Sequence, residues 1–190
     1  MSYYIDLFSP ETATAFEKSS RDVSGFRISR KTYVENQKIG PGDKLICYVT
    51  RLQRFVGVLE IKSKPFQDDR PIFTKENDPF ILRFNVAPIV WLPLEKSIPI
   101  HHDFIWNVLS FTKELSKGSN RWTFMVFSSP RLWPKDDCIF LLLSALMRRW
   151  SCLYFALHGC PSALNSWSSF NEMTIDQSVP SLIFSWWEHT

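Results

Sequence analysis

The chain has 190 residues, of which 45% are hydrophobic and 22% are charged, and its formal net charge is +3 at pH 7. This length and apolar content predict a folded globular protein of one domain, or one domain plus an appendage, with a proper core. The long apolar run from Cys138 to Met147 is too short to span a bilayer, so we expect no membrane-spanning segment.

The charges are distributed unevenly along the chain. All 22 Lys and Arg residues and 16 of the 19 acidic residues precede Ser151, which gives residues 1–150 a formal charge of +6. The remaining residues include three acids and no Lys or Arg. We therefore expect one domain at 1–150 and an aromatic C-terminal extension at 151–190, for which the sequence does not decide between order and disorder. The basic domain favours a polyanionic partner, first of all nucleic acid, although such a charge is also common on ordinary surfaces.

Motifs for metal binding and catalysis are missing from the sequence. The four cysteines are scattered, with no C-x-x-C pair and no histidine at zinc-finger spacing, so we expect no metal site and no cofactor. No G-x-S-x-G, H-E-x-x-H or Walker motif is present, which favours a binding protein over an enzyme. The N-terminal MSYYIDLFSPE has acids within its apolar run, unlike a signal peptide, so we expect a cytoplasmic protein with reduced thiols. The sequence carries no signal for an oligomeric state.

The first half of the chain predicts one strand and one helix before a well-marked hairpin. Tyr3–Phe8 is typical of a strand, and Ser9-Pro10-Glu11 is a good helix start, with the helix ending near Ser19. Gly40-Pro41-Gly42-Asp43 predicts a turn, after which Lys44–Thr50 and Phe55–Ile61 form paired strands. Gly57 inside the second of these strands indicates a bulge or a close backbone approach.

The second half predicts one long strand and two helices. Residues 66–78 are polar and indicate a loop, and Phe80–Pro93 predicts a buried strand interrupted at Ala87-Pro88. We expect Asp103 to cap a helix running from Phe104 to about Leu115. Trp122–Phe127 is compatible with a short strand or a pocket-lining loop. A last helix is predicted from about Asp137 to Arg149. In the two earlier elements, we expect Trp91 of the strand and Trp106 of the first helix to be core side chains.

The most basic and aromatic segment runs from Arg21 to Lys38. Its cations alternate with Phe26 and Tyr33. Taken alone, this pattern is most simply a solvated surface loop. The same composition also suits one side of a nucleic-acid site, where rings stack on bases and cations hold phosphates.

The ordered set of motifs resembles the EVE domain, a PUA-like family related to the YTH readers. The resemblance is carried by KIGPGDKLICYVT and RFVGVLEI, by the strand at Pro79–Phe84, and by Leu109–Lys113 together with Asn120-Arg121-Trp122. It covers roughly residues 1 to 137. It implies a PUA-like α/β (α+β) fold, with a curved mixed sheet or barrel of five or six strands flanked by about three helices.

The resemblance also implies a site. Phe26 and Trp122 match positions where an aromatic ring lines the family's pocket, although a tryptophan is common where this chain has Phe26. The expected modified-base pocket consists of Phe26, Ser29, Tyr33, Asn120 and Trp122. The side chains expected to bind the backbone and phosphates of the nucleic acid are Arg27, Arg30, Lys31 and Arg121.

The function implied is recognition of a flipped-out modified base without chemistry on it. The resemblance favours 5-methylcytosine or a related modified cytosine in DNA, read by the sensor part of a modification-dependent restriction system with a nuclease domain or subunit as partner. Two alternatives stay open. One is a reader of modified RNA, and the other is a protein-interaction module that docks through the aromatic tail with Trp186-Trp187.

Overall fold

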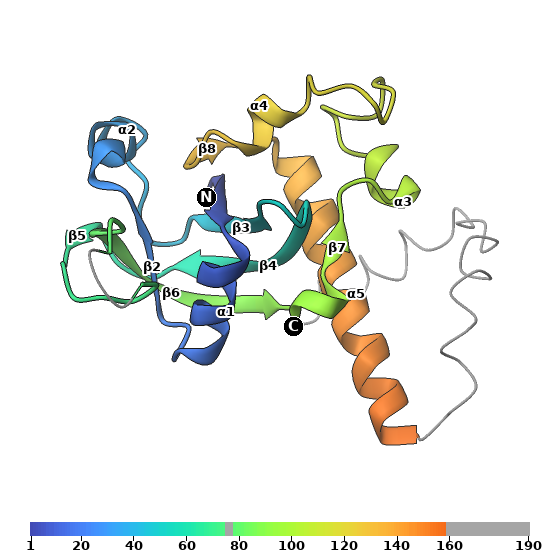
Figure 1. Cartoon of the computed structure of the whole chain (residues 1–190), viewed down its shortest axis with the longest axis horizontal. Helices are drawn as coiled ribbons and strands as arrows, with labels where there is room; N and C mark the ends of the chain where they lie inside the picture. The colour runs from blue at the N-terminus through green and yellow to red at the C-terminus, as the bar shows by residue number, and fades with distance from the viewer. Residues whose placement is uncertain (75–77, 159–190) are drawn as a thin grey trace. The chain divides into compact units, whose positions relative to one another are not determined.

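The fold is built around a mixed β-sheet centred on β1 (Tyr3–Phe8), β3 (Lys44–Val49) and β4 (Arg54–Ile61). β1 is parallel to β3, and β3 is antiparallel to β4. β4 pairs with β6 (Leu82–Trp91), which pairs in turn with β2 (Val23–Phe26), so segments far apart in the sequence become neighbours (Figure 1). The strand order is β2-β6-β4-β3-β1-β8, and short strands complete the sheet: β5 (Phe66–Gln67), β7 (Ile98–Pro99) and β8 (Arg131–Leu132).

The computed structural model describes residues 1–74 and 78–158, with side chains through residue 149. Within it, residues 1–151 form one compact unit. The part of the expected C-terminal extension that follows residue 158 lies outside the described residues. It includes Trp186-Trp187. In the described part of the chain, none of the helices combines the length and hydropathy needed to cross a bilayer.

The N-terminal helix begins where the sequence predicts. α1 (Pro10–Lys18) starts with proline at its first position, and Ser9 caps it. The Thr12 amide donates to Ser9 Oγ over 3.1 Å and the Ser9 amide donates to Thr12 Oγ1 over 2.8 Å, which satisfies two otherwise unpaired donors. Phe16 is fully buried, so this helix is fixed to the sheet by its apolar face.

The predicted hairpin is confirmed, including the role of Gly57. The turn at Gly40–Asp43 is closed by the Asp43 carboxylate, which accepts from the Gly40 amide over 3.2 Å. A register shift separates the pairs that β3 makes with Gly57 and with Phe55. A Cβ on Gly57 would collide with the carbonyl oxygen of Val90 on β6, so glycine is what allows β6 to approach this closely.

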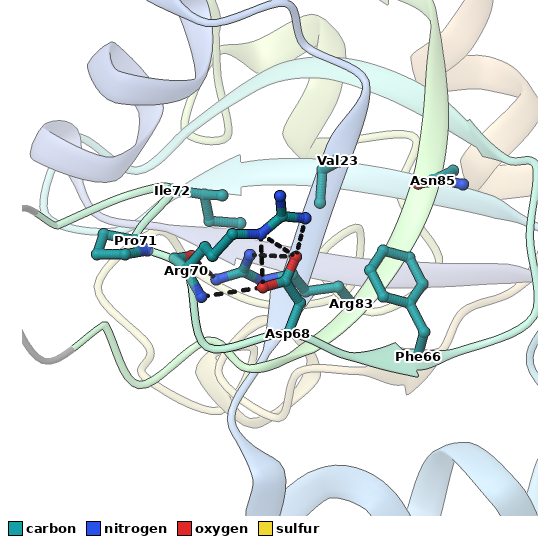
Figure 2. A pocket seen from close by; sticks show the side chains of 8 residues that line it. All are labelled: Val23, Phe66, Asp68, Arg70, Pro71, Ile72, Arg83 and Asn85. Atoms are coloured by element: carbon teal, nitrogen blue, oxygen red, sulfur yellow. Dashed lines mark hydrogen bonds and ion pairs between the residues drawn. The ribbon is translucent and has the colours of Figure 1, made fainter.

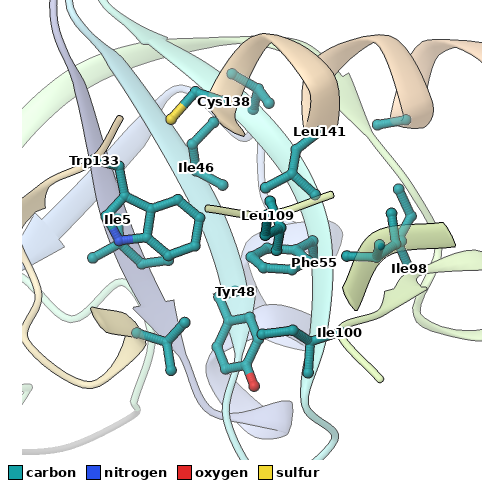
Figure 3. Close-up of a cluster of buried hydrophobic side chains, with 14 of the residues drawn as sticks. Ile5, Ile46, Tyr48, Phe55, Ile98, Ile100, Leu109, Trp133, Cys138 and Leu141 are labelled. Carbon is teal, nitrogen blue, oxygen red and sulfur yellow. The ribbon is translucent and has the colours of Figure 1, made fainter. Parts of the chain in front are cut away.

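The sheet separates two hydrophobic clusters because successive strand residues point to opposite faces. The first cluster contains Ile5, Tyr48 and Trp133, together with residues of the helix α5 (Lys135–His158) (Figure 3). The second contains Phe8, Phe16 and their neighbours from β2, β6 and α1. The core predictions for Trp91 and Trp106 are confirmed, since both are buried.

Two predictions in the second half are wrong. The helix expected from Phe104 to Leu115 is only α3 (Asp103–Trp106), with His102 as its N-cap. The chain leaves the helix because side chains provide other partners: Trp106 Nε1 donates to the Leu115 carbonyl over 2.8 Å, and the Ser110 amide donates to Asp137 over 2.9 Å. The segment 122–127 contains a short helix, α4 (Thr123–Val126), and no strand.

Two further predictions are extended by the structure. The last helix, expected from about Asp137 to Arg149, runs as α5 from residue 135 to 158. The basic segment 21–38 includes the strand β2, a 3-10 turn at Ile28–Arg30 and the helix α2 (Lys31–Asn36). The predicted α+β, PUA-like fold class is confirmed, with more strands than expected because β5, β7 and β8 have two residues each.

Candidate nucleic-acid interface

The basic segment leaves the sheet at the end of β2. Phe26 pairs with Leu82 of β6 and is only 4% exposed, with its ring edge-on to Phe84 at 6.0 Å between centroids. The polar residues that follow are exposed: Arg27, Ser29, Arg30 and Lys31. The structure therefore presents the predicted backbone-binding groups to solvent but places the Phe26 ring in the core.

Tyr33 joins this segment to the C-terminal half of the domain. It lies on α2, half-buried, and its hydroxyl oxygen accepts from the Leu132 amide of β8 over 3.3 Å. On the same helix, Lys31 Nζ lies 3.9 Å from Glu35 Oε1 and forms an ion pair with it. Both charged side chains are about half exposed, so this pair is weak and leaves Lys31 available to a phosphate.

Trp122 lies on the other face of the sheet from Phe26. Its ring is 3% exposed and belongs to the first cluster, edge-on to Trp106 at 6.0 Å and to His101 at 5.4 Å. Asn120 and Arg121, just before it, are exposed. The structure thus does not bring Phe26 and Trp122 into one aromatic cage, and base contacts by the pocket residues expected from the resemblance stay predictions.

A continuous set of contacts connects the basic segment to the loop between β5 and β6. The Arg27 guanidinium lies 5.7 Å from the centroid of the Phe80 ring, a cation–π distance. Arg83 of β6 donates from Nε to the Phe80 carbonyl over 3.1 Å, and from Nη2 to the Arg70 carbonyl. Its Nη1 atom also lies 3.4 Å from Oδ2 of Asp68, an ion-pair distance. Arg83 therefore holds both ends of this loop to the sheet.

Gly25 explains how an arginine can be buried here. Arg83 pairs directly with Gly25 across β2 and β6, and its side chain is 1% exposed. A Cβ on Gly25 would lie 2.8 Å from the Phe80 carbonyl oxygen and 3.3 Å from Arg83 Cγ. The missing side chain lets Arg83 cross β2 and reach its acceptors, which satisfy a charge that would otherwise be costly to bury.

Asp68 is the shared acceptor of the two arginines. It accepts from Arg70 Nε over 3.0 Å and Arg70 Nη2 over 2.6 Å, a paired geometry that suits a guanidinium. The hydrogen bonds from Arg70 hold the pKa of Asp68 well below its usual range, so this carboxylate stays ionised. Arg70 itself is 84% exposed at the rim.

A cavity of about 630 Å³ opens on this face of β2, β5 and β6. Its volume lies in the range typical of small-molecule and cofactor sites. Figure 2 shows the charged cluster in the middle, Pro71 and Ile72 to the left, and Phe66 and Asn85 to the right. The complete lining is Val23, Phe66, Asp68, Arg70, Pro71, Ile72, Arg83 and Asn85. Apolar surfaces and hydrogen-bonding groups thus converge on one space.

Sequence analysis missed this cavity. Apart from Val23, which belongs to the basic segment, its residues lie in the polar stretch predicted as a loop and in a strand predicted as buried on both faces. The available signal was Arg83, a charge within the apolar run FILRFNV, which indicates either a bulge or a paired buried cation. Among residues 1–74 and 78–158, no three His, Cys, Asp or Glu side chains are placed to hold a metal ion together.

Comparison with known proteins connects this chain to others through structure. No family model matches the chain, and no curated protein matches it by sequence. A solved complex of the Mmi1 YTH domain with RNA has a TM-score of 0.53 and 14% identity, covering 79% of this chain and 86% of that chain. The Pho92 YTH domain in complex with m6A has a TM-score of 0.50 and 16% identity, covering 76% of this chain and 82% of that chain. At these identities the likeness shows the fold alone, and the chain has a YTH-like, PUA-like fold.

Proposed function

We propose that this protein binds nucleic acid and recognises a modified base in it, without carrying out chemistry on the base. The observation that carries the proposal is the cavity beside β2, β5 and β6, next to an exposed basic segment. Support comes from the fold, which the chain shares with YTH domains solved with RNA and with m6A.

The chemistry of the face suits an unpaired nucleotide. Arg27, Arg30 and Lys31 are exposed along the segment that leaves β2, where they can follow a phosphate backbone. A base turned out of its strand enters a neighbouring cavity, where stacking contributes about 1 to 3 kcal/mol. A methyl group adds only about 0.8 kcal/mol when buried, so selectivity requires a closely fitting pocket.

Two ligands are candidates. RNA carrying N6-methyladenine is the first, because the Mmi1 and Pho92 domains were solved with RNA and with m6A. Modified cytosine in DNA is the second, because the motifs around KIGPGDKLICYVT resemble the EVE domain. In that case we propose that the protein is the sensing part of a modification-dependent restriction system, with a nuclease domain or subunit as partner. A cytoplasmic location remains part of the proposal.

Fluorescence anisotropy with short single-stranded oligonucleotides tests the proposal. The panel contains RNA and DNA strands with one N6-methyladenine, one 5-methylcytosine or neither. We expect tighter binding to one modified strand and steep weakening with salt. Equal binding across the panel would reject base recognition, and salt-independent binding would indicate apolar docking instead.

Charge variants locate the backbone contacts. The triple variant Arg27→Ala, Arg30→Ala and Lys31→Ala removes up to three phosphate contacts, so the slope of log affinity against log salt falls by about 2 for a single strand. The matched control replaces three exposed lysines from other parts of the domain: Lys18, Lys96 and Lys113. If both triple variants lower the slope equally, binding is a general effect of charge and the basic segment has no special role.

A further inference from the structure

Two side chains that line the cavity, the ring of Phe66 and the amide of Asn85, have no role in the ring contacts and hydrogen bonds that hold the fold together. Phe66 on β5 is half-buried, and its ring makes no contact with another aromatic ring of the described residues. Asn85 on β6 is exposed, and its side-chain amide makes no hydrogen bond within residues 1–74 and 78–158. Its backbone, in contrast, is fully used, because the amide donates to Ser63 Oγ over 2.9 Å and the carbonyl accepts from Lys62 over 2.7 Å.

Strand register brings these two side chains to one face. Phe66 pairs with Arg83, and Asn85 follows two residues later on the same strand, so its side chain points to the same side. Val23 pairs with Asn85 from β2 and supplies an apolar surface next to the amide. The backbone that carries both groups is held by the sheet, which gives them fixed positions.

We infer that this cavity takes an adenine base, stacked on Phe66 and read along its edge by the side-chain amide of Asn85. An amide offers one acceptor and one donor side by side. Adenine presents the complementary pair on both edges, N6–H with N1 and N6–H with N7, whereas guanine presents one only on its Watson–Crick edge, at O6 and N1–H, and two acceptors at O6 and N7. Adenine is therefore the base that matches Asn85 whichever edge enters.

A modified adenine is compatible with this arrangement. One methyl group on N6 leaves one N6–H, so the pair of hydrogen bonds at N6 and N7 survives. Val23, Pro71 and Ile72 provide the apolar surface that a methyl group requires. This assignment rests on the proposed function, since it names the base and the residues of the same site.

The test uses a short single-stranded RNA with one central N6-methyladenine, adenine, 7-deazaadenine or guanine, measured by fluorescence anisotropy. We expect Phe66→Ala to weaken binding to the adenine strands roughly 5- to 100-fold. Asn85→Ala should weaken it roughly tenfold and, where the N7 edge faces Asn85, remove the preference for adenine over guanine. The 7-deazaadenine strand distinguishes the edges, because loss of N7 weakens binding only if that edge faces Asn85.

Asn85→Ala is the decisive variant, because this side chain is exposed and makes no hydrogen bond to the described residues. Asn107→Ala, at another exposed asparagine, is the matched control. If the wild-type protein binds the adenine strand and Asn85→Ala binds it equally well, the inference is overturned while the proposed function stands. If the wild-type protein binds no strand, the proposed function itself fails. Weakening by Asn85→Ala and not by Asn107→Ala supports the assignment.

Discussion

Asp6 makes the stability of the domain dependent on pH. Its carboxyl is 2% exposed within the sheet, and Ser24 Oγ donates to it over 2.7 Å. Burial raises its pKa from 3.8 to about 7, only partly offset by the hydrogen bond from Ser24. Between these values the folded protein keeps a proton that the unfolded chain releases, so stability is present at low pH and is lost as pH rises toward 7.

The size of this effect follows from the shift. Each pKa unit corresponds to about 1.4 kcal/mol, so the full loss is about 4 kcal/mol, of which about 2.5 kcal/mol falls between about pH 5 and about pH 8. Asp6→Asn cannot ionise, and its amide oxygen can still accept from Ser24. We therefore expect the variant to gain about 2.5 kcal/mol relative to wild type over that interval.

Urea unfolding of both proteins at the two pH values measures this gain. Only the difference between the two proteins is used, so groups that titrate in both cancel. Cys47 lies close to Asp6, but burial holds the pKa of its thiol well above the usual value, so it stays protonated in this range. A difference between the proteins that is the same at both pH values would refute the reasoning, because Asp6 would then not titrate there.

Three further variants test how the sheet and the cavity loop are held. Arg83→Met leaves carbonyls and a carboxylate unpaired, and we expect a loss of about 2 to 4 kcal/mol in denaturant unfolding, with little rescue by lysine. Gly57→Ala forces a Cβ against the Val90 carbonyl and should cost more than about 2 kcal/mol, whereas Gly118→Ala, with no atom within 4 Å, should cost little. Asp78→Ala removes an acceptor of the amides at 72, 73 and 80, so hydrogen exchange at these amides should accelerate. Unchanged exchange would show that this carboxylate does not order the loop.

The parts of the fold predicted correctly are those specified by neighbouring residues. Ser9-Pro10 sets the start of α1, and the turn at 40–43 sets the start of β3, because capping and turn conformations depend on a few consecutive residues. The expected helix after Asp103 failed for the opposite reason. Its end is set by Ser110 and Asp137, which are distant in sequence, and no local pattern contains that information.

The candidate site was harder to predict because it depends on which sheet face a ring occupies. Phe26 and Trp122 both lie in irregular, basic segments, which suggested exposure. Pairing of Phe26 with Leu82 turns its ring toward the second cluster, while Trp122 packs in the first. A one-residue change in register would reverse the direction of Phe26, so its orientation follows from β6 and not from its own segment.

The buried arginine determines which variants can report on binding. Arg83 fixes the loop that carries Asp68 and Arg70, so its loss changes the shape of the cavity as well as stability. A binding defect in Arg83→Met would therefore have two explanations. Phe66 and Asn85 are held by strand pairing, and their side chains are free of hydrogen bonds to the described residues. Variants at these two positions thus separate recognition from folding, because their contacts to a base can be removed while the sheet that presents them is kept.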